Sequence, residues 1–370
     1  MAPLLDKIEE MLLMGPGPSC VPEAIYAAIR RPTIGHLDPH FIAIMDAIKT
    51  QLRELIGTAN QLTIPISGTG SAGMETCFVN LIEPGNRVLV LSNGVFGVRM
   101  QDVAGRLGAS VEALEFEWGT PVSVDQVARR LAERKYDIVA VVHAETSTGV
   151  RNPIEDIGKL LSGSGTIYLV DAVTSLAGIP IDMDACGIDA LYSGTQKCIS
   201  CPPGLSPVSM SEKALAKLKH RELKVPNWYL DLSMIVGYWA GEKRSYHHTA
   251  PINMLYALHA ALDLILAEGV SKVFERHGRS HEQLVAGLDK MGLKMLVERP
   301  YRLPMLNAVL VPEGVQEAVV RERLRTEFHI EIGAGLGPLA GKIWRVGLMG
   351  HTARQTNVDR FLDSLKKVLN

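Results

Sequence analysis

Apolar and polar positions alternate in two ways along the middle of this chain. Short apolar runs occupy 87–91, 138–142 and 167–170. Between these runs the apolar positions recur at helical spacing, over 98–107, 124–134 and 154–161. Strands that alternate with helices of this length are typical of βαβ units. The pattern therefore predicts an α/β fold built on a mostly parallel sheet, with tight turns such as Glu83-Pro-Gly-Asn86.

From about residue 251 the pattern changes. A long helix is expected over 253–268, because helical spacing stops at Gly269. The remaining sequence predicts two further helices and two apolar strands, at 271–291, 316–328, 307–311 and 343–348. We interpret this region as a second, smaller α/β unit.

The domain organisation follows from these two patterns. We expect a large domain over 21–250 and a smaller C-terminal domain over 251–370. Residues 1–20 are expected to form a segment close to the active site or to a partner subunit. With 370 residues and 47% hydrophobic content, the chain is large enough for such an arrangement.

Charge and composition narrow the possible partners. The net charge is −2, no basic stripe is present and aromatic residues make up 5%, so no nucleic-acid partner is expected. No apolar stretch reaches the roughly 18 residues of a membrane span, so no membrane partner is expected. The acidic start, with Asp6 and Glu9, has the features of neither a signal nor a transit peptide, and the terminal Val368-Leu-Asn370 is no peroxisomal address.

Cysteine and histidine positions bear on redox state and metals. An odd number of cysteines in a chain of this length indicates a reducing compartment, so a cytoplasmic location is predicted. Cys198-x-x-Cys201 has redox spacing, but no second pair completes a zinc site. His247 and His248 also lack a third ligand at suitable spacing. No metal site is expected.

A glycine-rich turn is the first candidate binding element. The apolar run 62–67 leads into Gly68-Thr-Gly-Ser-Ala-Gly73, and a helix is expected over 74–81. The turn formally matches the dinucleotide pattern, but the next apolar run ends Ser92-Asn-Gly94, without the acid that would bind a ribose. Amides at a helix N-terminus attract anions, which favours a single phosphate group. A dinucleotide site and a plain strand-to-helix turn stay open as alternatives.

Lys197 is the strongest catalytic candidate. It ends Tyr192-Ser-Gly-Thr-Gln-Lys197, and Asp171 closes an apolar run upstream. This pair suits pyridoxal 5′-phosphate (PLP), since a lysine can form a Schiff base with the aldehyde while an aspartate pairs with the pyridinium nitrogen. Otherwise Lys197 is one of 38 basic side chains and Asp171 is a helix cap.

These features occur in an order that resembles a known family. With the turn, Asp171 and Lys197, the chain is similar to fold-type I PLP-dependent transferases, and more closely to the class V aminotransferases of the alanine–glyoxylate and serine–pyruvate group. The resemblance spans nearly the whole chain. It rests on motifs at Gly15-Pro-Gly-Pro-Ser19, Gly35-His-Leu-Asp-Pro39, Ser67-Gly-Thr-Gly-Ser71, His143-Ala-Glu-Thr-Ser-Thr-Gly149, Val170-Asp-Ala-Val-Thr-Ser175, Ser193-Gly-Thr-Gln-Lys197, Tyr246-His-His-Thr-Ala-Pro251 and Trp344-Arg-Val-Gly-Leu-Met-Gly350.

The resemblance implies a role for each matching position. Lys197 would be the Schiff-base lysine and proton carrier, and Asp171 would keep the ring nitrogen protonated. Phe96 would stack on the cofactor ring, where relatives often have Trp, and Thr146 would reach the ring hydroxyl. The phosphate would be held by a set of small and polar residues, namely Thr69, Gly70, Ser71, Ala72 and Gln196.

Further positions concern the substrate and the partner subunit. By the same resemblance, Arg345 would bind the substrate carboxylate, which an arginine fork can grip through two parallel hydrogen bonds. Gly17 would lie over the substrate and leave little room for a large side chain. Tyr246 and Thr249 would reach the cofactor phosphate of the other subunit, which implies a homodimer with shared active sites.

The resemblance therefore implies a transaminase. Alanine or serine would be the donor and glyoxylate or pyruvate the acceptor, in a ping-pong reaction. An aminotransferase for another small amine, such as 2-aminoethylphosphonate, is an alternative. A different class, an NAD(P)-binding oxidoreductase that uses the turn at Gly68–Gly73, also stays open.

Overall fold

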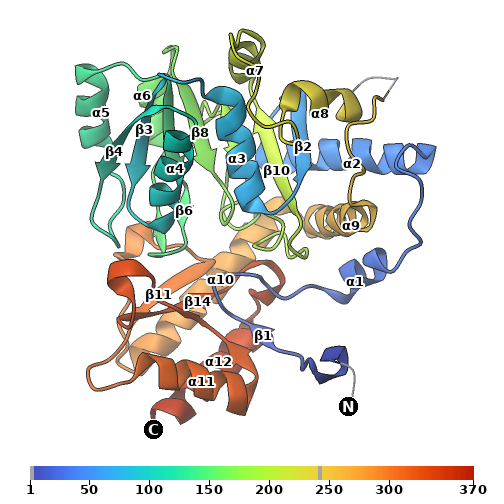
Figure 1. Cartoon of the computed structure of the whole chain (residues 1–370). Coiled ribbons are helices and arrows are strands. Elements are labelled where there is room, and N and C mark those ends of the chain that lie inside the picture. The colour runs from blue at the N-terminus through green and yellow to red at the C-terminus, as the bar shows by residue number, and fades with distance from the viewer. Residues whose placement is uncertain (1–3, 241–243) are drawn as a thin grey trace.

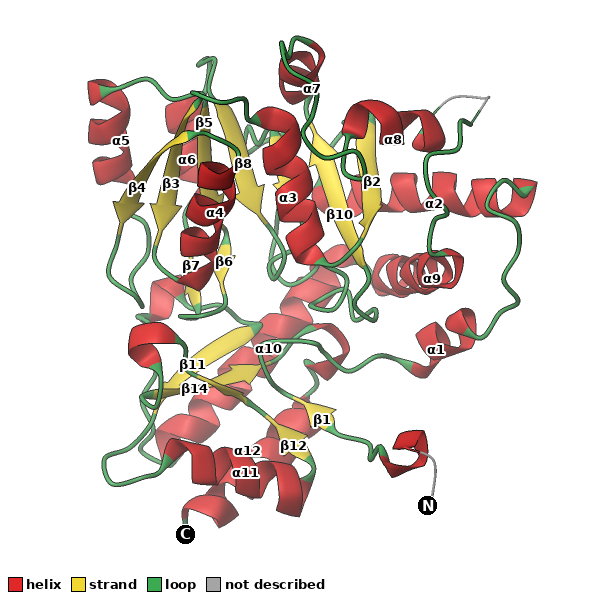
Figure 2. Ribbon diagram, viewed as in Figure 1, coloured by secondary structure: helices red, strands yellow, loops and turns green. Residues whose placement is uncertain are grey.

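A computed structural model describes residues 4–240 and 244–370. A large sheet with helices on both faces lies above a smaller unit (Figures 1 and 2). The large sheet has seven strands in the order β2-β10-β9-β8-β5-β3-β4. Their bounds are Leu62–Ser67 (β2), Arg87–Ser92 (β3), Ser110–Glu115 (β4), Ile138–Val142 (β5), Ile167–Asp171 (β8), Ala190–Tyr192 (β9) and Leu205–Met210 (β10).

The sheet is mostly parallel, as predicted. Only β10 runs antiparallel to its two neighbours, β2 and β9. The apolar strands β5 and β8 are buried along their whole length, which explains why they read as continuous hydrophobic runs rather than as alternating patterns. The prediction of an α/β fold built on a mostly parallel sheet is confirmed.

The connecting helices agree with the predicted ones in position but begin earlier in two cases. Helix α3 spans Gly70–Leu81, and α4 spans Val95–Arg106. The first turn of α3 consists of glycine and small residues (Gly70-Ser-Ala-Gly73), so hydrophobic periodicity could not reveal it. The other helices of this unit are α1 (Glu23–Ile29), α2 (Pro39–Ile56), α5 (Val124–Glu133), α6 (Ile154–Leu161), α7 (Glu212–Lys219) and α8 (Leu232–Trp239).

The smaller unit has its own core. Strands β11 (Leu306–Leu310), β14 (Ile343–Gly347) and β13 (Gly333–Ala334) form a sheet that packs on helices α10 (Val270–Lys290), α11 (Glu317–Phe328) and α12 (Gln355–Leu369). Trp344 and Phe361 are among its buried side chains.

Helix α9 (Ile252–Glu268) joins the two units. Its buried side chains, including Leu255 and Leu262, belong to the core of the large sheet, together with α2. This packing favours a boundary near Gly269, whereas residue 251 was the boundary that we expected from the sequence. The division into domains otherwise stays a prediction.

The N-terminal segment returns to the smaller unit. Strand β1 (Leu12–Leu13) pairs in parallel with β12 (Ile330–Glu331), and the amide of Gly347 donates to the carbonyl of Met14 at 2.7 Å. Residues 15–19 then lead from the small unit toward the large sheet.

In the described ranges, no single helix is long and apolar enough to cross a membrane. Helices α9 and α10 pass that test only as a joined pair, which is bent by 83°.

Candidate active site

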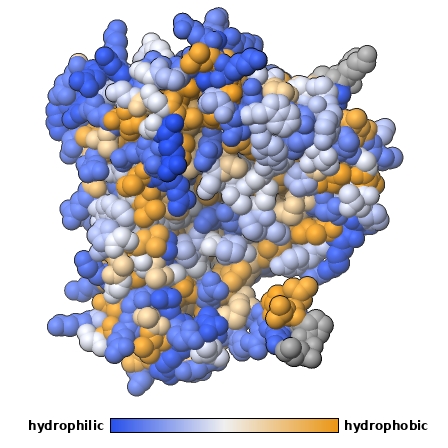
Figure 3. Space-filling view, viewed as in Figure 1, coloured by the Kyte–Doolittle hydropathy of each residue, from blue (hydrophilic) through white to orange (hydrophobic). Residues whose placement is uncertain are grey.

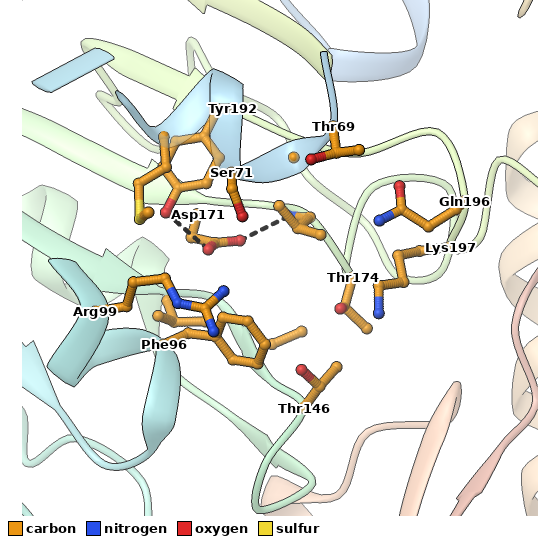
Figure 4. Close-up of a pocket in the computed structure, with 15 residues that line it drawn as sticks. Thr69, Ser71, Phe96, Arg99, Thr146, Asp171, Thr174, Tyr192, Gln196 and Lys197 are labelled. Atoms are coloured by element: carbon orange, nitrogen blue, oxygen red, sulfur yellow. Dashed lines mark hydrogen bonds between the residues drawn. The ribbon is translucent and has the colours of Figure 1, made fainter. Parts of the chain in front are cut away.

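A cavity opens at the carboxyl ends of the parallel strands, where α/β proteins commonly bind ligands (Figure 4). Its walls come from the ends of β8 and β9, the first turns of α3 and α4, and the loop after β5. Most of the predicted cofactor residues line it: Thr69, Gly70, Ser71, Phe96, Thr146, Asp171, Gln196 and Lys197. Segments that are far apart in the sequence therefore meet in one place.

Lys197 lies on one side of this cavity. Its Nζ donates a hydrogen bond to the Pro16 carbonyl, and burial lowers the pKa of the ammonium group to about 8. Ser19 fixes the backbone here, since its hydroxyl donates to the Lys197 carbonyl at 2.8 Å and its amide to the Gln196 carbonyl at 2.9 Å. The N-terminal turn thus fixes the backbone of Gln196 and Lys197 through Ser19.

Asp171 ends β8 and is held by two hydrogen bonds. Its Oδ1 accepts from the Val173 amide and its Oδ2 accepts from the Tyr192 hydroxyl, each at 2.8 Å. Burial raises the pKa of this carboxyl to about 6. Tyr192 was missed as a site residue, because a hydrogen bond between neighbouring strands leaves no signal in a single sequence.

The first turn of α3 faces the cavity. Thr69 is the N-cap, but no side chain caps the turn, so the backbone amides at its start are available to a ligand. Gly70 permits the close approach of this turn to the site, since a Cβ there would lie 3.0 Å from Val173 Cγ2. Ala72 is not among the residues that line the cavity, and its amide donates to the Thr69 carbonyl at 2.7 Å.

Phe96 and Thr146 both line the cavity (Figure 4). The guanidinium carbon of Arg99 lies 5.0 Å from the centroid of that ring, within range of a cation–π contact. Arg99 lines the cavity and was also missed, although its position one helical turn after Phe96 places both on one face of α4.

Arg345 lies in the centre of β14 and is 7% exposed. Its Nε donates to the Ala334 carbonyl at 2.6 Å and its Nη1 to the Thr146 carbonyl at 3.2 Å. Within residues 4–240 and 244–370, no carboxylate forms a salt bridge with it. Burial is the main cause of the lowered pKa of Lys197, and the positive charge of Arg345 lowers it further.

The remaining predicted residues lie at the edge of the site or outside it. Gly17 packs on Lys197 so closely that a Cβ would collide with the lysine side chain. Tyr246 is 60% exposed and pairs with Thr249, hydroxyl to hydroxyl at 3.4 Å. Neither residue lines the cavity of its own chain.

Gln196 precedes Lys197 and lines the cavity. Its Oε1 is buried without a hydrogen-bond partner among the described residues, so it is free to accept a hydrogen bond from a ligand. In the part of the chain that the structure describes, no group of three or more His, Cys, Asp or Glu is arranged to hold a metal ion.

Comparisons with known proteins agree with this arrangement. The model of the family Aminotransferase class-V matches residues 22–361. Alanine–glyoxylate aminotransferase from Oryctolagus cuniculus is 38% identical over 361 residues, which cover 97% of this chain and 92% of that protein. (S)-Ureidoglycine–glyoxylate transaminase from Bacillus subtilis strain 168 is 37% identical over 375 residues, which cover 96% of this chain and 90% of that protein.

Among solved structures, alanine–glyoxylate aminotransferase from Nostoc sp. has a TM-score of 0.97. It is 47% identical, and the match covers 100% of this chain and 97% of the Nostoc chain. The similarity therefore extends over both units and over every segment that lines the cavity.

Proposed function

The chain belongs to the class V aminotransferase family, and we propose that it moves the amino group of a small amino acid to a small 2-oxo acid. Alanine or serine is the proposed donor, glyoxylate or pyruvate the proposed acceptor, and PLP the cofactor. The names of the relatives, which specify glyoxylate, support this acceptor. Family membership also removes the support for a dinucleotide-dependent oxidoreductase.

The residues of the cavity fit PLP. The uncapped first turn of α3 offers backbone amides to a phosphate, and Gln196, whose side chain lines the cavity, can donate to it from Nε2. Asp171, held from two sides, can pair with a protonated ring nitrogen. Once bound there, PLP supplies a carbonyl that condenses with amines and a ring that accepts electrons from the substrate's Cα–H bond.

Lys197 would carry the proton. Burial lowers its pKa to about 8, so roughly one molecule in ten holds the free amine at pH 7. Its Nζ lies under the N-terminal turn, where the Pro16 carbonyl accepts its hydrogen bond. The amine therefore lies at the wall of the cavity, where it could exchange a proton with a bound substrate.

Arg345 is the observation that carries the substrate assignment. Burying a charge without a carboxylate in hydrogen-bond contact is costly, yet the hydrogen bonds of this buried guanidinium go to carbonyls. A planar carboxylate would supply the missing negative charge. Since Gly17 lies against Lys197 above the site, we propose that the substrate beside Arg345 is small.

We also propose that the enzyme is a cytoplasmic homodimer with shared sites. Tyr246 and Trp228 are each 60% exposed, although both are aromatic. The N-terminal end exposes Leu4 and Leu5 by 81% and 78%, and apolar atoms project from the body there (Figure 3). Exposed apolar patches are typical of surfaces that bind another chain.

The test is an absorbance experiment on purified protein supplied with PLP. Alanine or serine, added without an acceptor, should convert the yellow band of the bound cofactor to a shorter-wavelength band, and glyoxylate should restore it. Arg345→Lys should need at least ~100-fold more alanine for the same conversion, because an ammonium point charge cannot replace the fork. The response to a simple amine without a carboxylate should be unchanged.

Two results would count against the proposal. If no band appears even with added PLP, or if Lys197→Ala leaves the band unaltered, the cofactor assignment is wrong. If only 2-aminoethylphosphonate converts the band, the substrate assignment is wrong and the cofactor assignment stands.

A further inference from the structure

Glu145 is a buried acid that the roles described so far leave unused. It ends the short strand β6 (Ala144–Glu145), directly before Thr146 in the segment after β5, and is fully buried. Its Oε1 accepts from the amide and the hydroxyl of Ser147, at 3.0 and 2.6 Å, and its Oε2 accepts from the amide of Phe96 at 3.3 Å. A carboxylate is therefore aimed at the start of α4.

Ser147 completes the contact. Its hydroxyl donates to Glu145 and accepts from the Val95 amide at 3.0 Å. The N-cap residue of α4 is Gly94, which has no side chain to cap the helix. The loop after β5 thus supplies the missing cap, and the position of the first turn of α4 depends on this loop.

The packing shows that this contact is close. Gly94 has extended backbone, so its conformation does not require glycine. A Cβ at this position would nevertheless collide with the Glu145 carboxyl and with the Ser147 hydroxyl. The start of α4 therefore lies in such close contact with Glu145 and Ser147 that position 94 has no room for a side chain.

The same loop also holds the substrate arginine. Thr146, between Glu145 and Ser147, accepts the hydrogen bond of Arg345 Nη1 through its carbonyl. Three consecutive residues therefore connect Phe96 on the large unit with Arg345 on the small one.

We propose that Glu145 is a positioning residue that holds the ring of Phe96 and the guanidinium of Arg345 in fixed relation, so that cofactor ring and substrate carboxylate are aligned. This inference rests on the proposed function. Glu145 touches neither reactant and acts through its two neighbours.

Charge supports this role. Burial raises the pKa of Glu145 to about 7, and the hydrogen bonds from Ser147 and Phe96 oppose that rise. The titratable groups that face it are Asp171, Tyr192 and Arg345. Near neutrality a substantial fraction is ionised, and the positive end of α4 favours that form.

Glu145→Gln tests the inference, because the amide keeps the volume but cannot accept from Ser147 and from Phe96 at once. In the apo-protein, amide hydrogen exchange at Phe96 should become faster. With PLP, the visible circular dichroism of the bound cofactor should weaken, and KM for alanine should rise about tenfold, more than kcat falls. Ser147→Ala should act in the same direction. Glu275→Gln, an exposed acid on α10, is the matched control and should behave as wild type.

The outcomes distinguish failure of the positioning role of Glu145 from failure of the proposed function. Faster exchange at Phe96 with unchanged dichroism and KM would make Glu145 a helix cap only and overturn the inference. If Glu145→Gln does not fold, Ser147→Ala decides by the same measurements. Wild-type protein that binds no PLP would instead remove the proposed function, and this inference with it.

Discussion

At the scale of single residues, burial sets the chemistry of the site. The same desolvation raises the pKa values of Asp171 and Glu145 and lowers that of Lys197, because each shift favours the neutral form. The apo-site therefore holds less charge than its composition suggests. A cationic ring nitrogen beside Asp171 would favour the ionised carboxylate, so binding of the cofactor would lower the pKa of Asp171 again.

This shift gives a pH dependence of stability with a definite sign. Between pH 3.8 and about 6, Asp171 binds more protons in the folded than in the unfolded state. Its contribution to stability is thus present below pH 4 and lost as the pH rises through 6. The free energy of unfolding of apo wild type minus that of Asp171→Asn should fall by about 3 kcal/mol over this window and stay level above it.

Urea unfolding at a series of pH values measures this difference. The difference is used because buried histidines such as His143, whose pKa burial lowers to about 3, shift the curves of both proteins alike. Asp125→Asn, an exposed acid on α5, serves as control. A difference that increases with pH would contradict the assigned environment of Asp171.

Some site residues could be predicted from the sequence and others could not. Lys197 and Asp171 stand at the ends of recognisable motifs, so pattern alone located them. Tyr192, Glu145 and Arg99 act through contacts between strands, loops and ring faces that form only in three dimensions. Glu145 belongs to the motif His143–Gly149, but only the structure shows that its carboxylate bonds the first turn of α4.

At the scale of elements, helix α3 shows how a small residue positions a binding turn. The helix lies close to β10 and β9 because Gly73 faces them, and a Cβ there would overlap the Ser206 hydroxyl and lie 3.2 Å from Tyr192 Cβ. The early start of α3 was missed for the same reason, since glycine and serine give no hydrophobic period. The small residues that let this turn lie close to the cavity also leave no hydrophobic pattern from which it could be predicted.

Gly73→Ala should therefore destabilise the protein by ~2 kcal/mol through overpacking, despite the better helix propensity of alanine. It should also weaken PLP binding, since Tyr192 and the turn would shift. Gly278→Ala on α10 is the matched control, because open space surrounds that glycine. The control should be neutral or stabilising by up to ~1 kcal/mol. Equal destabilisation of both variants would show that packing at Gly73 is not the cause.

At the scale of the whole molecule, the site is assembled from distant parts. The mostly parallel sheet followed from strand–helix alternation, whereas its strand order and the docking of α9 on the large core did not. Both depend on which apolar faces meet, and a periodicity does not specify that. Tyr246 and Thr249 remain outside the cavity of their own chain, as a shared site requires.

Mixing two inactive variants tests the shared site. Lys197→Ala and Tyr246→Ala should each have little activity alone. After subunit exchange, half of the dimers are mixed, and each mixed dimer has one intact site, so about a quarter of wild-type activity should return. A transaminase assay of the mixture measures it, with sedimentation to verify the dimer. No recovery would place the complete site within one chain.

The pairing of β1 with β12 has a consequence for biosynthesis. Leu12 leaves the ribosome long before Ile330, so the two strands can pair only after the whole of the large sheet between them has been translated. Until then the turn that covers Lys197 has no anchor on the small unit. This anchor therefore forms only after β12 has been translated, and a chain without β12 would lack it however well its large sheet had folded.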